Sequence, residues 1–224
     1  MDQRLAERLS QQLKIALEHV VREEYELLIL KKLLDTALGS AVVFKGGTAL
    51  RLAYGSPRFS DDLDFSILAP ISAEVFSRIA ETVAQAAPQV TLVEALSKRF
   101  TLFALYKVRE PHLPYAFSIK LKVSTRAETW EREQDFTLRL LTSPVTPVSV
   151  LAHTATLEKM WADKQATFAA SRQPRDLYDL WFIAQKLRRP FTSDASGCDP
   201  KVIRRELHKY LPRNHWQVVE SWIG

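Results

Sequence analysis

The sequence predicts an α+β protein with two lobes, and three observations support this prediction. Leucines recur at helical spacing over residues 5–38. Apolar and polar side chains alternate within residues 89–125, as is typical of strands. Beyond residues 142–150, which contain two prolines and are expected to form a linker, the pattern is helical. We therefore expect a lobe with a short mixed sheet at 1–145 and a helical lobe at 146–224.

Each expected element of the first lobe has a local sequence signal. The β-branched run AVVF predicts a buried strand, the pair Gly46-Gly47 ends it, and Thr48 is expected to cap the next helix. The alternating segment DLDFSIL predicts a second strand. The elements expected in order are leucine-rich helices ending at Gly39, a strand at 41–44, a helix at 48–55, a strand at 62–68, a helix at 72–87 closed by Pro88, and strands at 89–96, 100–108 and 115–124.

The second lobe is expected to consist of helices at 149–171, 174–188 and 200–210, followed by a short helical tail. Asp199 and Pro200 form a good helix start, because an N-cap residue is followed by proline at the first helical position.

Composition limits the class of protein. The 224 residues carry a net charge of +5, which permits a polyanionic partner without requiring one. A single cysteine excludes an intrachain disulfide and a cysteine-rich zinc site. The first residues carry charges of both signs and no apolar run reaches about 18 residues, so we expect a cytoplasmic protein without a membrane partner.

Two carboxylates define the first candidate site. Asp62 and Asp64 are two residues apart on an expected strand, so their side chains project from the same face. Two negative charges this close repel each other unless a cation lies between them. Oxygen ligands of this kind hold Mg²⁺, which usually also contacts substrate phosphates. The alternative is that this is a solvated strand end.

The glycine pair supplies the second part of the same site. A turn without side chains, followed by a helix N-terminus, exposes backbone N–H groups that bind phosphate. The order of strand, Gly46-Gly47, helix, loop and acidic strand brings both features to one end of a small sheet.

Two segments carry a resemblance to a known family. The segment KGGTALRLAYGSPRFSDDLDFSI (45–67) resembles the N-terminal signature of the AbiEii/AbiGii nucleotidyltransferase toxins, which include the MenT group. The segment LEKMWADKQATFAASRQPRDLYDLWFI (157–183) is similar to the second signature of that family. The two motifs occur in the family's order, and the resemblance covers roughly residues 40–185.

The resemblance implies a polymerase-β-like nucleotidyltransferase lobe followed by a helical lobe. It implies metal-dependent transfer of a nucleotide from an NTP to an acceptor, with Asp62 and Asp64 as catalytic ligands of Mg²⁺ or Mn²⁺. The acceptor would be a tRNA 3′ end, and the protein would be the toxin of a toxin–antitoxin or phage-defence (abortive infection) system with an antitoxin encoded nearby. The residues expected near the triphosphate are Gly46, Gly47, Thr48 and Ser60, and Ser60 is also a position at which the family has inhibitory phosphorylation.

The second motif is expected to complete the site. Asp176 and Asp179 share one face of a helix, and Lys164 lies on the preceding helix. By resemblance Lys164 stabilises the triphosphate, and Asp179 acts as a base or as an orienting acid. For Arg175 and Asp176 two interpretations stay open, namely nucleotide binding and an Arg–Asp network that joins two helices.

One departure from related transferases concerns the strand FSIKLKVS. Many of those enzymes place a third carboxylate on a neighbouring strand, where this sequence offers Lys120 and Lys122. Either Asp179 replaces that acid, or these lysines bind phosphate, or metal binding is weaker, or the lysines are a solvated face. Transfer to a protein or small molecule, and a non-catalytic NTP-binding module, are therefore the alternative functions.

Overall fold

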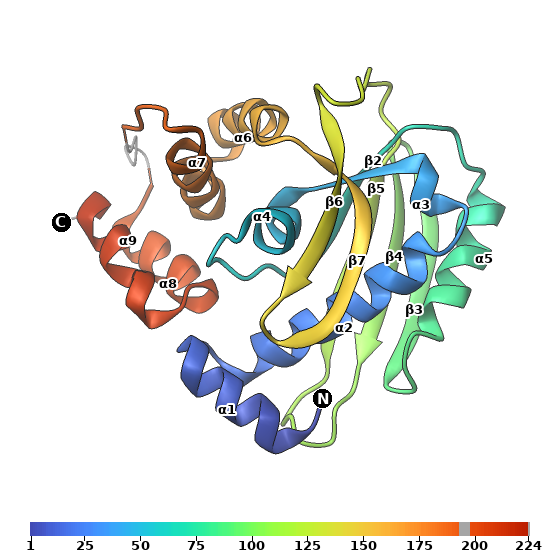
Figure 1. Ribbon diagram of the computed structural model, residues 1–224, viewed down its shortest axis with the longest axis horizontal. Coiled ribbons are helices and arrows are strands. Elements are labelled where there is room, and N and C mark those ends of the chain that lie inside the picture. The colour runs from blue at the N-terminus through green and yellow to red at the C-terminus, as the bar shows by residue number, and fades with distance from the viewer. Residues whose placement is uncertain (193–197, 224) are drawn as a thin grey trace.

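The computed structural model describes residues 1–192 and 198–223, in which one seven-stranded mixed sheet is surrounded by helices (Figure 1). The elements are α1 (Gln3–Leu13), α2 (Leu17–Leu34), α3 (Leu38–Ala41), β1 (Val42–Lys45), α4 (Gly46–Tyr54), β2 (Asp62–Ile67), α5 (Ala73–Ala84), β3 (Val90–Lys98), β4 (Thr101–Val108), β5 (Phe117–Ser124), β6 (Phe136–Ser143), β7 (Thr146–Ala155), α6 (Leu157–Ser171), α7 (Pro174–Leu187), α8 (Pro200–Tyr210), η1 (Arg213–His215) and α9 (Trp216–Ile223). The predicted α+β class with a mixed sheet is confirmed, and the sheet is larger than expected.

The sheet order β3-β4-β5-β2-β1-β7-β6 determines what lies at the site. Strands β1 and β2 are antiparallel and pair Lys45 with Asp64, so the end of β1 lies beside the start of β2. Strand β5 runs parallel to β2 and pairs Lys122 with Asp64. Below this edge the rings of Phe44 and Phe65 pack 5.0 Å apart in the core. A rigid, buried strand pair therefore holds the acidic positions.

The helices divide into two groups around the sheet. Helix α2 packs along β7, α5 packs along β3, and the two helices contact each other. Helix α4 contacts β2 and β6, and it lies between the sheet and the helices α6 to α9, which occupy the left side of Figure 1. None of the described helices is long and apolar enough to cross a membrane.

Helix α2 is buried along most of its length even though it carries several charged residues. Arg22 donates to the backbone oxygen of Ser118 at 2.5 Å, and Glu23 binds Arg51. Glu26 is also buried, and within the described residues its Oε1 has no hydrogen-bond partner. Burial, with a smaller contribution from Glu23, raises the pKa of Glu26 well above its ordinary value. This carboxyl group therefore opposes folding once the unfolded chain releases its proton.

Glu26→Gln should make the protein more stable at pH 7.5 by at least about 1 kcal/mol, because the folded wild type must hold a proton that the unfolded chain releases. Each unit by which the folded pKa exceeds the unfolded pKa is worth about 1.4 kcal/mol. A folded pKa above the unfolded value makes wild-type stability fall as pH rises from about 4.5 through the folded pKa. Glutamine removes this dependence, so the two proteins should converge at pH 4. Urea denaturation at both pH values measures the difference, and an equal difference at pH 4 and pH 7.5 would contradict it.

The interpretation of 142–150 as a linker is wrong. Strands β6 and β7 form a hairpin here, and Pro144 lies in the turn while Pro147 lies near the start of β7. Both positions tolerate the missing N–H of proline. A division of the chain at 145/146 falls within this hairpin and stays a prediction.

Two helix boundaries differ from the expectation and a third agrees with it. Helix α6 begins at Leu157 rather than at 149, because 149–155 belong to β7, and Thr156 caps α6 by accepting from the Lys159 N–H. Gly39 lies inside α3 and does not end α2, which stops at Leu34. The expected start of α8 is confirmed, since Asp199 accepts from the Lys201 N–H and Pro200 is its first residue.

Candidate active site

The acid pair lies at the start of β2, where both side chains are partly exposed. The side chain of Asp62 is 23% exposed and that of Asp64 36%. The ammonium group of Lys122 lies 2.6 Å from Asp62 Oδ2 and 3.9 Å from Asp64 Oδ1. Burial raises the pKa of Asp64; Lys122 opposes this rise and Asp62 adds to it. The predicted repulsion between the acids is therefore balanced by a cation from β5.

The neighbouring acid, Asp61, belongs to a different contact. It accepts a hydrogen bond of 2.5 Å from the Tyr210 hydroxyl and lies 3.3 Å from Arg22 Nε. It thus joins α2 to α8, so the acids at positions 61, 62 and 64 have two separate roles.

The N-terminus of α4 faces the acid pair. The helix begins at Gly46, and its N-cap residue, Lys45, makes no side-chain cap. A methyl group added at Gly47 would overlap the guanidinium of Arg58 and lie 2.8 Å from Ser60 Oγ. A helix start without a side-chain cap offers backbone N–H groups to an anion.

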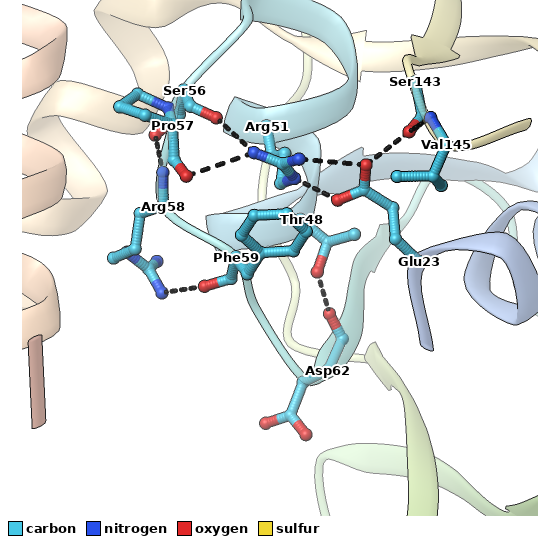
Figure 2. A network of polar contacts seen from close by, with 10 residues as sticks. All are labelled: Glu23, Thr48, Arg51, Ser56, Pro57, Arg58, Phe59, Asp62, Ser143 and Val145. Atoms are coloured by element: carbon cyan, nitrogen blue, oxygen red, sulfur yellow. Dashed lines mark hydrogen bonds and ion pairs between the residues drawn. The ribbon is translucent and has the colours of Figure 1, made fainter. Parts of the chain in front are cut away.

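Thr48 has another position than expected. It is not the cap of α4, which starts two residues earlier, and it is fully buried. Its hydroxyl donates to the backbone oxygen of Asp62 at 2.6 Å (Figure 2). Thr48 therefore fixes the start of β2 against α4.

A second anchor holds the loop that leads into β2. Arg51, on α4, donates to Glu23 and, at 3.1 Å each, to the backbone oxygens of Ser56 and Pro57 (Figure 2). Its guanidinium also lies over the ring of Phe59, 3.4 Å from the centroid. The loop is thereby held in one position, which in turn places Arg58 and the acid pair.

The second motif forms a buried charged cluster with Arg58. Lys164 lies 2.6 Å from Asp176 Oδ1 and 2.7 Å from Asp179 Oδ2. Arg58 donates to both oxygens of Asp179, at 2.7 and 2.8 Å. Burial opposes the ionisation of Asp179, but Arg58 and, to a smaller extent, Lys164 hold the pKa of this carboxyl group below its usual value. Burial likewise opposes the charge of Lys164, yet Asp179 and Asp176 raise its pKa. Both groups are charged at neutral pH.

Two adjoining cavities meet at these residues. The smaller, of about 150 Å³, is bordered by Gly47, Arg58, Ser60, Asp62, Gln173 and Arg175. The larger, of about 430 Å³, extends past Lys45, Lys122, Phe100 and Arg126. Asp64, Lys164 and Asp176 border both cavities. The structure thus brings the two sequence motifs to one place.

Asp179 differs from the other expected residues. Its side chain is only 1% exposed and is enclosed by Arg58 and Lys164, and it borders neither cavity. This geometry favours the orienting alternative for Asp179 over the role of base. The interlobe partner of Asp179 is Arg58, whereas Arg175 borders the smaller cavity and lies 5.7 Å from the ring of Tyr210.

Sequence reasoning missed Arg58 and the aromatic side chain of Phe100. Arg58 stands in the first motif, three residues after Gly55 and two before Ser60, but nothing local indicates its partner. Phe100 is 44% exposed and lies beside Arg99 and Arg126, at 4.9 and 5.8 Å from ring centroid to guanidinium carbon. No sequence signal distinguishes it from other strand-end aromatics.

The acid pair has the donor chemistry that a divalent metal needs. Two carboxylates supply oxygen ligands, and Mg²⁺ completes its octahedron with water and phosphate oxygens. Gly46 leaves the necessary space, because a methyl group there would lie 2.9 Å from Asp64 Oδ2. No cluster of three or more His, Cys, Asp or Glu side chains suited to a metal occurs among the described residues. The pair therefore fits a metal ion that takes two ligands from the protein and further ligands from a substrate phosphate.

Gly46→Ala should destabilise the protein by about 1–3 kcal/mol and also displace Asp64, because Gly46 has φ +84° and no room for a methyl group. Gly55→Ala is the matched control: its φ is +75°, but nothing lies within 4 Å of an added methyl group. Both variants should lose stability in urea denaturation, and Gly46→Ala should lose more because its methyl group also crowds Asp64. Only Gly46→Ala should lose NTP affinity in the presence of Mg²⁺, and equal affinity in both variants would contradict the prediction.

Comparison with known proteins identifies the family of the chain. A family profile described as nucleotidyl transferase AbiEii toxin, type IV toxin–antitoxin system, matches residues 28–216. Among curated proteins, no relative matches the chain significantly.

Two solved structures share the fold. The crystal structure of JHP933 from Helicobacter pylori has a TM-score of 0.57 and 23% identity, and covers 85% of this chain and 79% of its own. The crystal structure of a "putative nucleotidyltransferase" from H. pylori has a TM-score of 0.61 and 21% identity, with coverage of 93% and 92%. Because the family profile spans most of the chain, this protein belongs to the nucleotidyl transferase AbiEii toxin family of type IV toxin–antitoxin systems.

Proposed function

We propose that this protein transfers a nucleotide from an NTP·Mg²⁺ (or Mn²⁺) complex to a hydroxyl group at an RNA 3′ end, with a tRNA as the first candidate. It would do so as a cytoplasmic toxin controlled by an antitoxin encoded nearby, in a phage-defence (abortive infection) setting. The supporting observation is that Asp64, Lys164 and Asp176 border both of two adjoining cavities. A reaction that joins two substrates needs such a shared boundary.

The smaller cavity suits the triphosphate. The start of α4 directs backbone N–H groups there, and Arg175 and Lys164 add positive charge. Ser60 borders the same space and adds a hydroxyl donor. These groups would neutralise the charge of the phosphates and orient the α-phosphorus toward the larger cavity.

Catalysis would rest on positioning and charge. A divalent ion held by Asp62 and Asp64 would supply charge neutralisation to the α-phosphate and the leaving group. The acceptor hydroxyl oxygen would form a bond to the α-phosphorus and release its proton to water. The bond between the α-phosphorus and the oxygen that bridges it to the β-phosphate would break, releasing pyrophosphate. Lys164, fixed by Asp176 and Asp179, would stabilise the charge that develops on the departing phosphates.

The larger cavity favours a nucleic-acid acceptor. Phe100 at its mouth presents an exposed aromatic ring flanked by Arg99 and Arg126. Unpaired bases stack on such rings, and arginines bind the adjoining phosphates. The net charge of +5 agrees with a polyanionic partner. Transfer to a protein or small molecule would leave this aromatic and basic rim without a use.

One observation favours a second candidate, a non-catalytic NTP-binding module. Lys122 already neutralises the acid pair that would hold the metal. In that case the protein would bind NTP but would transfer nothing.

The test is incubation with each α-³²P-labelled NTP, Mg²⁺ and total RNA, followed by gel electrophoresis. Label in a band that ribonuclease removes supports the proposal. Label that resists ribonuclease and is lost with protease indicates a protein acceptor. NTP binding by calorimetry without label transfer to any acceptor would support the non-catalytic module.

Ser60→Glu should lower NTP affinity by about ten-fold or more, because a third negative charge beside Asp62 and Asp64 repels the triphosphate. This variant imitates a phosphate group on Ser60, the modification that would switch the site off. Ser60→Ala is the control and should lose less affinity than Ser60→Glu, since it removes one hydrogen bond to a phosphate and adds no charge. Calorimetric titration with NTP measures both, and full affinity of Ser60→Glu would end the regulatory hypothesis.

A further inference from the structure

The ammonium group of Lys122 occupies the space between the two carboxylates of β2. It makes a hydrogen bond of 2.6 Å to Asp62 and lies 3.9 Å from Asp64. Strand β5 places it there, because β5 runs parallel to β2 with Lys122 opposite Asp64. Lys120, two residues earlier on the same strand, is exposed and is opposite Asp62 in the register. Lys122 is therefore partly buried and in contact with the acid pair, whereas Lys120 is exposed.

The neighbouring cations are held by other acids. Lys164 lies 2.6 Å from Asp176, and Lys45 lies 3.5 Å from Asp163. Among the ion pairs of residues 1–192 and 198–223, it is Lys122 that contacts the acid pair. This side chain is 35% exposed and borders the larger cavity, so it has room to move.

We propose that Lys122 occupies the cation position of the acid pair in the nucleotide-free protein and transfers to the polyphosphate when metal and NTP bind together. The inference rests on the proposed function, because it assigns the same acids to a metal. Asp62 Oδ2 cannot serve an ammonium group and a divalent ion in the same position. A metal that binds alone must therefore displace Lys122, and the positive charge of the displaced ammonium group then stays close to the metal and repels it.

Nucleotide changes this balance. A triphosphate brings negative charge to the edge of the cavity that Lys122 borders, so the displaced ammonium group gains a new partner. Metal and NTP should consequently bind cooperatively, and metal alone should bind weakly. Lys122 then acts as a positioning residue that keeps the site closed to free divalent ions.

The test compares Mn²⁺ alone with Mn²⁺ and a non-transferable α,β-methylene NTP analogue, by calorimetric titration of the wild-type protein. Each ligand should raise the affinity for the other by about ten-fold or more, as is usual for a coupled pair of sites. Lys122→Gln should bind Mn²⁺ alone more tightly than wild type, by about ten-fold, and should show a weaker effect of the analogue.

Matched variants at the neighbouring lysine control for a general change of charge. Lys120→Gln removes the same charge from the same strand and should leave Mn²⁺ binding unchanged. Lys122→Asp should bind Mn²⁺ alone most tightly, because it adds a third oxygen ligand at the place of the ammonium group. Lys120→Asp should not share that gain, and circular dichroism checks that each variant is folded.

Two results would overturn the inference. One is wild-type protein that binds Mn²⁺ equally well with and without the analogue. The other is Lys122→Gln and Lys120→Gln with the same Mn²⁺ affinity. These readouts do not depend on turnover, so their failure is distinct from failure of the proposed transfer. Coupled binding without any labelled product would preserve the inference and refute transfer, whereas labelled RNA with uncoupled binding would do the reverse.

Discussion

Asp64→Ala is expected to lower nucleotidyl transfer by at least about 10³-fold, because it removes one of the two carboxylates proposed to hold the metal, at the boundary of both cavities. Asp62→Ala should have a similar effect, since the two side chains share one face of β2. Neither variant should unfold the protein. Each leaves Lys122 paired with the remaining acid, and removal of one charge also reduces the repulsion within the pair.

The sequence offers a control directly beside the pair. Asp61→Asn changes the charge of the adjacent position but affects a contact between Arg22 and Tyr210. Asp61→Asn should lower the free energy of unfolding, while the rate of nucleotidyl transfer per folded molecule stays that of the wild type. The assay is single-turnover incorporation of labelled nucleotide at saturating Mg²⁺, with the folded fraction measured by circular dichroism. Near wild-type turnover in either Asp64→Ala or Asp62→Ala would remove the assignment of a metal to this pair.

Local sequence patterns were sufficient to predict the parts of the site that lie within one segment. The spacing of Asp62 and Asp64, and the glycines at the start of α4, indicate their arrangement without knowledge of the fold. The contact between Lys122 and Asp62 spans 60 residues, and that between Arg58 and Asp179 spans 121. Such pairs depend on the order of the strands and on how the helices pack, which local periodicity does not determine.

The hairpin of β6 and β7 was missed for a different physical reason. Leu138, Leu140 and Leu151 are all more than half exposed, so the outer face of the hairpin is apolar like the inner face. Alternation predicts a strand only when one face is polar. On β7, Val150, Ala152 and Thr154 are buried at alternate positions, but the apolar Leu151 between the first two hides the period of two.

Asp179→Ala should have the largest effect on stability, a loss of about 3–5 kcal/mol, because it leaves buried cations without their counter-charge. Arg58 is 3% exposed and has two hydrogen bonds to this carboxylate, and Lys164 also depends on it. A loss of this size is a large part of the 5–15 kcal/mol typical of a folded protein. Urea denaturation followed by fluorescence and circular dichroism measures it. A change below about 1 kcal/mol would show that Arg58 finds another partner.

Acid should also lower the free energy of unfolding of the wild-type protein, because it protonates Asp179. The pKa of Asp179 is lower in the folded state than its ordinary value of 3.8, so its contribution is complete above that value. The contribution is lost as pH falls below 3.8 toward the folded pKa. Asp179→Asn should therefore be less stable than wild type at pH 7, and the difference should shrink at pH 3.

Lys164→Met distinguishes the roles of the two residues. It should lower the rate of transfer by about 10²–10³ through loss of charge at the departing phosphates. It should cost less stability than Asp179→Ala, because Asp179 keeps both hydrogen bonds from Arg58. If Asp179 acts through Lys164, the double variant Lys164→Met/Asp179→Asn should be no slower per folded molecule than Lys164→Met alone. If Asp179 were an independent base, the two losses would multiply, and the enclosed carboxylate would have to open to the cavity during the reaction.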